Sequence, residues 1–394
     1  MRGKRQAFSR EGKCVIDFST GASFNVRTLD QQRWFLCASE PCQHEGRVHV
    51  TMASAPIAGR SDVSSRTTSP NTPFFIFGCP RSGTSLLSRM LGAHPNLAIP
   101  DESHLYNNVY PLVARYGDLS LERVRARLVS QILKTEHIRT WTPVPSVTDI
   151  LSRLERNDFH GIVDGLLRGW AALVGKARWG EKTPQHTLCW RTILSGFPNA
   201  QVVHLVRDGR DVMLSYRSAF FGPKHVYPLA LRWRQYLSAA EEAGTVLGEG
   251  RFLQVRYEDL VTAPERELRR ICAFLGEEFT SDILNFYRER RALSPDRRNS
   301  EGLLQPVMSN NTEKWRANMT PRELRIFEAL AGDCLERLGY ERTHPSPSIS
   351  RWESLSCRYL EHPPRYLSSM LRNQQAHRMV VQRLRLGLSL IARN

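Results

Sequence analysis

The chain has 394 residues, of which 41% are hydrophobic, and it carries a formal net charge of +16 at pH 7. The length is sufficient for one large domain or two small ones, and the hydrophobic fraction is that of a globular protein with a buried core. No apolar run approaches the roughly 18 residues that a membrane-spanning helix needs, so we do not expect a transmembrane protein. The high positive charge indicates an acidic partner, a membrane surface or an anionic ligand, although the arginine-rich C-terminus accounts for part of it.

The first 72 residues differ in composition from the rest of the chain. We interpret residues 1–52 as a poorly defined N-terminal extension and residues 53–72, which are rich in Ser, Thr and Pro, as a flexible linker. The basic N-terminus has no apolar stretch behind it, which argues against a signal peptide and favours a cytoplasmic protein with reduced thiols. Among the eight cysteines, Cys37 and Cys42 are close together but lack a second pair, so we expect no metal site.

From Pro73 onward, segments with strand character alternate with helical segments. Phe74–Phe77 and residues 200–206 are apolar runs typical of strands buried on both faces of a parallel sheet. Residues 177–184 indicate a short strand and loop, and residues 251–257 a further strand that ends at Tyr257. Residues 104–175 are mostly helical by their periodicity.

This alternation predicts an α/β fold, a P-loop-like three-layer sandwich with a central, mostly parallel sheet flanked by helices. We place this domain at residues 73–345 and expect a basic helical C-terminal extension at residues 346–394. Ligands of such sheets bind at the carboxyl ends of the strands. Gly78, Arg207 and Tyr257 all fall at or just after a predicted strand end, so they are candidates for the binding site.

The sequence "CPRSGTS" after the first strand is typical of an anion-binding loop. The spacing Gly78-x4-Gly83 fits the nucleotide-binding pattern, but the lysine of that pattern is missing and Arg81 is the one cation of the loop. Backbone N–H groups at the start of the following helix, together with the helix dipole, favour an anion. Hydroxyl donors are added by Ser82, Thr84 and Ser85. These groups predict a phosphate or sulfate cradle, with an ordinary Gly/Ser turn as the alternative.

A second cluster lies in "VVHLVRDGRDVMLSYRS". Arg207 directly follows the buried strand, and Ser215 lies eight residues later in the next helix. An arginine at a strand end and a hydroxyl two turns along can hold another phosphate. The alternative is that Arg207 and Arg210 form surface pairs with Asp208 and Asp211, which would contribute little to stability.

With these motifs, the sequence resembles the sulfotransferases that use 3′-phosphoadenosine 5′-phosphosulfate (PAPS), in particular bacterial-type members near the tyrosylprotein sulfotransferase branch. "PRSGTS" at 80–85 matches the family loop P-[KR]-S-G-T-[ST], which grips the 5′-phosphosulfate through Arg81, Ser82, Gly83, Thr84 and Ser85. The resemblance implies that the 3′-phosphate is bound by Arg207 and Ser215, that Tyr257 of "YEDL" lies near the adenine, and that Lys314 and Trp315 close over the nucleotide. It also implies transfer without ATP or bound metal, which accounts for the missing lysine.

The resemblance further implies that an acceptor hydroxyl or amine attacks the sulfur in line, while adenosine 3′,5′-bisphosphate leaves. In the protein-tyrosine branch the base is the second glutamate of a "G-E-E-T-R" stretch, and an alignment without gaps places Glu102 at that position. The arginine of the stretch is His104 here, a departure that puts the family's acceptor contacts in doubt. Without the resemblance, Glu102 reads equally well as a carboxylate stabilised at a helix N-terminus.

The stretch "GEKTPQH" supplies the other predicted catalytic groups. By resemblance, Lys182 stabilises the sulfuryl group or the leaving oxygen, and with Glu102 and Arg81 it completes the predicted catalytic set. His186 is the alternative base, because a histidine follows a comparable "K-T" in the cytosolic small-molecule branch. The C-terminal "R-K-G…G-D-W-K-N" block of that branch is absent, which favours Glu102. Lys182 could instead pair with Glu181 or be a solvated loop lysine.

We therefore predict an enzyme that transfers a sulfuryl group from PAPS to a hydroxyl, with a carboxylate base. One alternative is a P-loop kinase or another phosphotransferase with a degenerate Walker A loop, in which Asp208 would bind Mg²⁺; the missing lysine argues against it. A second is a non-enzymatic protein that binds acidic surfaces. No aromatic–basic motif supports a nucleic-acid partner.

The acceptor pocket is expected to come from residues 104–175 and 216–250. A small molecule, a glycan, a lipid or a peptide can each provide the hydroxyl. Four large aromatic residues could face the pocket or, as is commoner, belong to the core: Trp141, Trp170, Trp233 and Tyr236. The basic C-terminus from Pro363 could make a peripheral membrane contact, but such a helix more often covers its own core.

Overall fold

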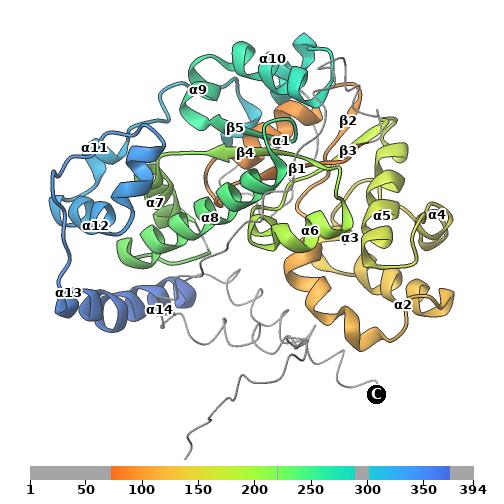
Figure 1. The fold of residues 1–394 in the computed structure, drawn as a ribbon, viewed down its shortest axis with the longest axis horizontal. Helices are drawn as coiled ribbons and strands as arrows, with labels where there is room; N and C mark the ends of the chain where they lie inside the picture. The colour runs from red at the N-terminus through yellow and green to blue at the C-terminus, as the bar shows by residue number, and fades with distance from the viewer. Residues whose placement is uncertain (1–71, 220, 289–300, 373–394) are drawn as a thin grey trace, which may run out of the picture. The chain divides into compact units, whose positions relative to one another are not determined.

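The computed structural model describes residues 72–219, 221–288 and 301–372 (Figure 1). The expected N-terminal extension, almost all of the linker, and residues 373–394 lie outside these ranges, as do Cys37 and Cys42. The domain boundaries at residues 52, 72 and 345 stay predictions. Within the described residues, no helix is both long and apolar enough to cross a membrane.

The core of the fold is a five-stranded sheet with the strand order β2-β3-β1-β4-β5, in which all neighbouring strands are parallel. The strands are β1 (Phe74–Phe77), β2 (Leu97–Ala98), β3 (Arg178–Glu181), β4 (Gln201–Val206) and β5 (Phe252–Arg256). β1 and β4 are in register from Phe74 beside Gln201 to Phe77 beside His204. Both strands are buried along their whole length, as expected for apolar strands covered on both faces.

The predicted parallel sheet is confirmed, but β2 was not predicted from the sequence, and β4 begins at Gln201 rather than at residue 200. The strand predicted at residues 251–257 ends at Arg256 rather than at Tyr257, because Tyr257 is already the first residue of helix α9 (Tyr257–Thr262). The sheet is also entirely parallel in its described strands, where the sequence predicted a mostly parallel one.

Helices cover both faces of the sheet (Figure 1). One face packs on α1 (Thr84–Gly92), α9, α10 (Pro264–Leu275) and η5 (Ser281–Arg288), and includes the side chains of Phe74 and Ile76. The other face packs on α5 (Phe159–Leu173), α6 (Trp190–Gly196) and α8 (Val226–Leu247), and includes Phe75 and Phe77. Alternate residues of β1 thus face opposite layers, as the pleat of a strand requires.

The remaining helices follow in chain order. Between β2 and β3 lie the π-helix η2 (Leu105–Val109), the 3₁₀-helix η3 (Tyr110–Tyr116), and the α-helices α2 (Glu122–Leu133), α3 (Glu136–Arg139) and α4 (Val147–Ser152). The 3₁₀-helix η4 (Pro184–Cys189) follows β3. α7 (Gly209–Ser218), α11 (Trp315–Asn318) and α12 (Pro321–Arg337) pack on α8. The 3₁₀-helix η6 (Glu301–Leu304) precedes α11, and the described chain ends with α13 (Arg351–Leu355), the π-helix η7 (Ser356–Glu361) and α14 (His362–Arg372).

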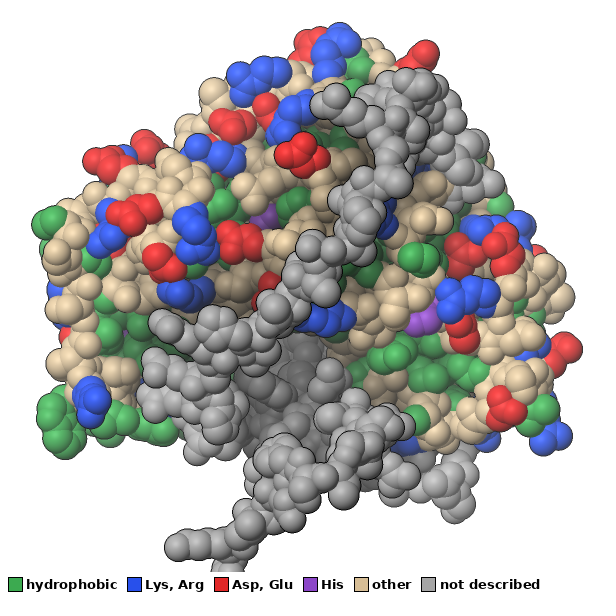
Figure 2. All heavy atoms as spheres, viewed as in Figure 1, with side chains coloured by type: hydrophobic (Ala, Val, Ile, Leu, Met, Phe, Trp, Pro, Cys, Tyr) green, Lys and Arg blue, Asp and Glu red, His purple; other side chains and the backbone are tan. Residues whose placement is uncertain are grey.

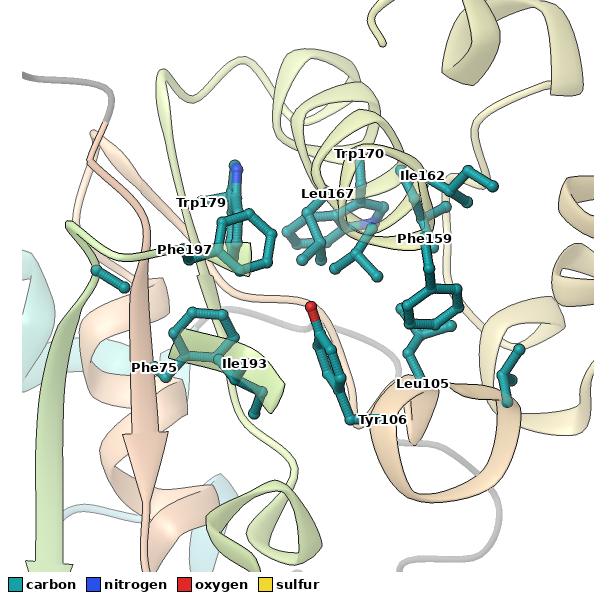
Figure 3. Packing of buried hydrophobic residues seen from close by; sticks show 14 of the residues in the cluster. Phe75, Leu105, Tyr106, Phe159, Ile162, Leu167, Trp170, Trp179, Ile193 and Phe197 are labelled. Carbon is teal, nitrogen blue, oxygen red and sulfur yellow. The ribbon is translucent and has the colours of Figure 1, made fainter. Parts of the chain in front are cut away.

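The four aromatic residues considered for the acceptor pocket belong to the core. Trp141 and Trp170 contact each other edge to face, with ring centroids 6.0 Å apart, in the cluster that Figure 3 shows around Phe75 and Trp179. Trp233 and Tyr236 are buried on α8, and the indole N–H of Trp233 donates a hydrogen bond to a backbone carbonyl. Packing of large aromatics in the interior is therefore their role here.

Candidate active site

The loop between β1 and α1 is anchored to η4 by hydrogen bonds. The backbone N–H of Gly78 donates a hydrogen bond to Oγ1 of Thr187 (2.9 Å), and the same hydroxyl donates to the Gly78 carbonyl (3.3 Å). The N–H of Ser82 closes a turn on the carbonyl of Cys79 (3.0 Å). These contacts fix the start of the loop and close its turn at the carboxyl edge of the sheet, where an α/β sheet binds its ligands.

The conformation of the loop leaves the start of α1 available to an anion. Gly83 is the N-cap of α1 with φ 97°, and no side chain caps the helix. The first-turn N–H groups of a helix have no acceptor within it, and α1 carries no acidic residue in that turn to neutralise its positive end. Oγ of Ser82 is buried without a hydrogen-bond partner among the described residues. The residues therefore fit a tetrahedral oxyanion.

Gly83 lets the backbone of the loop lie directly against the ring of Tyr257. A Cβ atom at Gly83 would lie 2.4 Å from the ring of Tyr257. Only a residue without a side chain therefore allows Tyr257 to pack directly on the loop. Arg81 itself has φ 78°, a region that costs energy for a residue with a side chain and that is often found at ligand sites.

The two predicted phosphate grips come together in space. Nε of Arg81 donates a hydrogen bond to Oγ of Ser215 on α7 (3.0 Å), and Arg207 donates to the backbone carbonyl of Arg81 (3.3 Å). The guanidinium of Arg207 also lies 4.2 Å from the ring centroid of Tyr257. Residues from three strand ends thus form one cationic cluster beside the loop.

Arg207 is held in place by neutral partners. It donates to the carbonyl of Asn311 (2.6 Å), whose side-chain amide donates to the hydroxyl of Tyr257 (2.9 Å), while Nε of Arg207 has no partner among the described residues. Its nearest carboxylate is Asp211, at 3.9 Å. Burial lowers the pKa of Arg81 from its ordinary value, and the neighbouring Arg207 adds to this. Two desolvated cations with few anionic partners favour a bound anion.

The ion pairs that the sequence suggests as the alternative for this segment do form, but they are buried rather than on the surface. Arg210 forms ion pairs with Asp208 (2.8 Å) and with Glu328 (3.1 Å), and it is almost completely shielded from solvent. Asp208 also caps α7 by accepting a hydrogen bond from the N–H of Arg210. These residues fix the start of α7 and so position Ser215.

The Lys314–Trp315 pair has two different environments. The ring of Trp315 is buried, with the Arg210 guanidinium 3.6 Å from its centroid, and its backbone N–H donates to Oδ1 of Asp211 (2.9 Å). Lys314 is exposed at the N-cap of α11. The predicted closure of this pair over a nucleotide stays a prediction, and the segment is tied to the site through Asn311.

The predicted catalytic residues form a continuous chain of contacts. Lys182, which directly follows β3, is 1% exposed; its ammonium group donates to Oγ of Ser85 in the first turn of α1 (3.2 Å) and forms an ion pair with Glu102. Ser85, Lys182 and Glu102 thus connect the anion loop to a carboxylate that is 28% exposed. Such a carboxylate is accessible to an acceptor beside the loop.

Glu102 is charged in this environment. Burial alone would raise its pKa, but Lys182 and His104 outweigh burial and hold the pKa well below its ordinary value. Nε2 of His104 lies 3.3 Å from Oε2 of Glu102, and the His104 ring contacts the ring of His137 at 4.1 Å between centroids. Glu102 precedes η2 and its N-cap, so its partners are these side chains and not a helix N-terminus.

His186, the alternative base, is buried with both ring nitrogens engaged. Nδ1 donates to Oε2 of Glu181 (2.7 Å), and Nε2 accepts a hydrogen bond from the backbone N–H of Tyr106 (3.1 Å). Hydroxyl groups of Ser103 and Thr183 also donate to Glu181. Burial would raise the pKa of Glu181, but these partners, led by His186, lower it. With no free lone pair, His186 supports the loop 103–106.

The same network explains why Lys182 does not pair with its neighbour Glu181. Glu181, the last residue of β3, pairs with His186, whereas Lys182, the next residue, pairs with Glu102; side chains of consecutive residues in an extended chain point to opposite sides. Thr187, Asn311 and the Glu181–His186 pair were not identified from the sequence, because their partners are far away along the chain.

Most residues of the candidate site lie in a part of the chain that is similar in sequence to a known protein family. A family model described as "Sulfotransferase family" matches residues 73–281. The chain is 25% identical over 319 residues to protein-tyrosine sulfotransferase A of Caenorhabditis elegans, covering 77% of this chain and 75% of the relative. It is 24% identical over 293 residues to the nodulation protein NoeE of Sinorhizobium fredii, covering 68% and 66%.

Two solved structures that resemble the chain have TM-scores below 0.5. The sulfotransferase domain of the Synechococcus PCC 7002 olefin synthase is 25% identical and covers 69% of this chain and 96% of its own, with a TM-score of 0.44. The mouse sulfotransferase SULT7A1 complexed with PAP is 13% identical and covers 69% and 89%, with a TM-score of 0.36.

Proposed function

The chain belongs to the sulfotransferase family, and we propose that it transfers a sulfuryl group from PAPS to an acceptor hydroxyl by in-line displacement with Glu102 as the base. The contact chain Ser85–Lys182–Glu102 is the observation that carries the proposal, because it joins an anion-binding loop to an accessible carboxylate. Proximity of the two is what a transfer between donor and acceptor requires.

The donor would be bound at two anionic ends. The loop amides, Arg81, Ser82, Thr84 and Ser85 would hold the 5′-phosphosulfate. Arg207 and Ser215 would hold the 3′-phosphate, and Tyr257, whose ring already packs on Gly83 and Arg207, would lie beside the adenine. These groups lie together beside the carboxyl ends of β1, β4 and β5, which supports a single binding site for the donor.

The reaction would proceed by attack of the acceptor oxygen on sulfur. A new S–O bond forms as the bond from sulfur to the phosphate oxygen breaks, and adenosine 3′,5′-bisphosphate leaves with the electron pair. The acceptor proton would pass to Glu102. Lys182 and Arg81 would neutralise charge on the sulfuryl group and on the leaving oxygen.

Lys182 would also control the basicity of Glu102. In the structure the ammonium group contacts both Glu102 and Ser85. If a bound sulfuryl group draws Lys182 toward the loop, Glu102 loses the cation that depresses its pKa and becomes a stronger base. Donor binding would then prepare the base for the acceptor.

The acceptor class that we propose to test first is a peptide tyrosine, because several relatives are protein-tyrosine sulfotransferases. A small molecule, a glycan and a lipid are the other classes. His104 stands at the position of the arginine in the "G-E-E-T-R" stretch and contacts Glu102, so it would lie next to the attacking hydroxyl.

The kinase alternative has less support in this structure. Its Mg²⁺ ligand would be Asp208, but that carboxylate is occupied by Arg210 and by the helix N-terminus. A cytoplasmic location stays a prediction of the sequence.

The test is a panel of acceptors incubated with radiolabelled PAPS. We expect label on one acceptor class, binding of adenosine 3′,5′-bisphosphate in the presence of a chelator, and no binding of ATP. Arg81→Ala should weaken donor binding by about ten-fold or more, because it removes a charge-assisted contact. Arg217→Ala, an exposed arginine on the same helix as Ser215, is the control. No labelled acceptor, together with unchanged donor binding by Arg81→Ala, would overturn the proposal.

A further inference from the structure

The last described helices form one continuous amphipathic run. α13, the π-helix η7 and α14 follow each other without a break from Arg351 to Arg372. The run has an inward face, an outward face and a flank between them, and each carries a different kind of side chain.

The inward face carries both carboxylates of the run. Glu353 forms ion pairs with Arg322 and Arg325 of α12, and Glu361 pairs with Arg322 (2.8 Å). Cys357, between them, is fully buried. The negative charges of the run are therefore turned toward the protein and neutralised there.

The outward face is apolar and exposed. Trp352 is 83% exposed, Leu360 71% and Leu367 58%. The same face includes Leu355, Tyr359 and Tyr366. In Figure 2 hydrophobic atoms gather where Figure 1 places α13, at the lower left. An almost completely exposed tryptophan in a continuous apolar stripe is typical of an interaction surface.

A row of arginines flanks this stripe. Arg351, Arg358 and Arg365 are spaced seven residues apart. Each of them directly precedes an aromatic residue of the stripe (Trp352, Tyr359 and Tyr366), so each lies about a quarter turn from the stripe, on the same side of it, in the α-helical turns and in the π-helical η7 alike. Arg351 and Arg365 are exposed, and Arg358 lies over the ring of Tyr359 at 5.3 Å.

We propose that the outward face of residues 351–367 docks on an anionic lipid bilayer, lying in the plane of the interface. Apolar side chains on one face, aromatic residues and a cationic edge are what such a helix needs to enter the headgroup region. Anionic headgroups neutralise the arginine row, and the two carboxylates that would be repelled already face α12. An antiparallel symmetric contact with a second copy would instead bring two arginine rows together.

This inference does not rest on the sulfuryl-transfer chemistry, because none of its residues belongs to the candidate active site. It concerns where the enzyme is placed. An enzyme held at an anionic surface would encounter acceptors that are themselves at that surface.

The experiment is sedimentation of the full chain with vesicles of phosphatidylcholine alone or mixed with phosphatidylserine. We expect binding to the mixed vesicles only. The pair Trp352→Ser and Leu360→Ser should lower the partition about ten-fold or more, because two large apolar side chains no longer enter the membrane. The pair Arg351→Gln and Arg365→Gln should lower it about five-fold for each arginine at low salt, and less at high salt.

The matched control is the pair Leu231→Ser and Val246→Ser, which removes two exposed apolar side chains from α8. This pair should bind vesicles as the unchanged chain does, and thermal unfolding should show that all variants are folded. If the apolar variant is not folded, the arginine pair still tests the proposal. Absence of any preference for anionic vesicles, or an equal loss in the control pair, would overturn it. The proposal would also be overturned if the unchanged chain self-associated without binding vesicles and the apolar variant abolished this self-association.

Discussion

Glu102 and Lys182 form an ion pair in which the ammonium group is buried and the carboxylate is partly exposed. The same ammonium group contacts Ser85 of the anion loop. A single side chain from the end of β3 therefore links the residue expected to accept a proton with the loop expected to hold the donor. This link leads to predictions that separate the role of Glu102 from the roles of its neighbours.

Replacing Glu102 with Gln should abolish turnover while leaving donor affinity unchanged. The substitution removes the basic lone pair but keeps the size of the side chain, and general base catalysis typically contributes about 10²- to 10⁴-fold. Turnover with the active acceptor and binding of adenosine 3′,5′-bisphosphate are measured side by side. Asp101→Asn, which removes the neighbouring carboxylate, is the control and should keep most of the activity.

Replacing His186 with Ala should act on stability and not on the base. The substitution leaves Glu181 without its main partner and the N–H of Tyr106 without an acceptor, which should cost about 2 to 4 kcal/mol of unfolding free energy. Denaturant unfolding measures this cost. If the folded His186 variant loses turnover completely while Glu102→Gln retains it, the two residues must exchange roles.

Recognition of the 3′-phosphate can be tested with two nucleotides. Arg207→Ala or Ser215→Ala should weaken binding of adenosine 3′,5′-bisphosphate by about 10- to 100-fold, because charge-assisted hydrogen bonds are lost. Neither should weaken binding of adenosine 5′-phosphosulfate, which lacks the 3′-phosphate, to the same extent. Calorimetry with both nucleotides gives the comparison, and Arg217→Ala is the matched control. Equal losses for the two nucleotides would contradict the assignment.

Local patterns predicted the sheet and the anion loop, because both depend on short stretches of sequence. The apolar run Phe74–Phe77 and the small residues after it define a buried strand and a loop at its carboxyl end without reference to other segments. Arg207 could be placed beside that loop because parallel strands end at the same edge of a sheet.

Contacts between distant segments could not be predicted in this way. Gly78 and Thr187 are 109 residues apart in the chain, and nothing near either residue indicates their hydrogen bond. His186 shows the consequence most clearly. Its sequence context is that of a base, but only the folded structure shows that Glu181 and Tyr106 occupy both ring nitrogens.

Gly83 offers a test of the close approach between the loop and Tyr257. Gly83→Ala and Gly175→Ala both place a side chain at a positive φ, which costs about 1 to 2 kcal/mol. At Gly83 the added Cβ would also collide with the Tyr257 ring, whereas at Gly175 nothing lies within 4 Å. We expect only Gly83→Ala to lose donor binding, and we expect it to lose more unfolding free energy. Equal effects of the two substitutions in binding assays and denaturant unfolding would show that the clash is relieved.

The charge of Asp211 is poorly stabilised in the folded protein. Burial raises its pKa from 3.8 to about 6, only partly offset by Arg207 and by the N–H of Trp315, and its Oδ2 has no hydrogen-bond partner among the described residues. The folded state therefore binds a proton at Asp211 more tightly than the unfolded state does. Stability from this group is present at low pH and is lost as the pH rises through the window from about 4 to about 6.

Asp211→Asn should remove this pH dependence. The amide keeps an oxygen that accepts the hydrogen bond from Trp315 but carries no charge to desolvate. Below pH 4 the variant and the unchanged chain should have similar unfolding free energies, while above pH 6 the variant should be more stable by up to about 3 kcal/mol, the equivalent of a shift of about two pKa units. Denaturant unfolding across this pH range measures the difference. A variant that is less stable at neutral pH would show that the attraction between Asp211 and Arg207 outweighs the cost of burying the carboxylate.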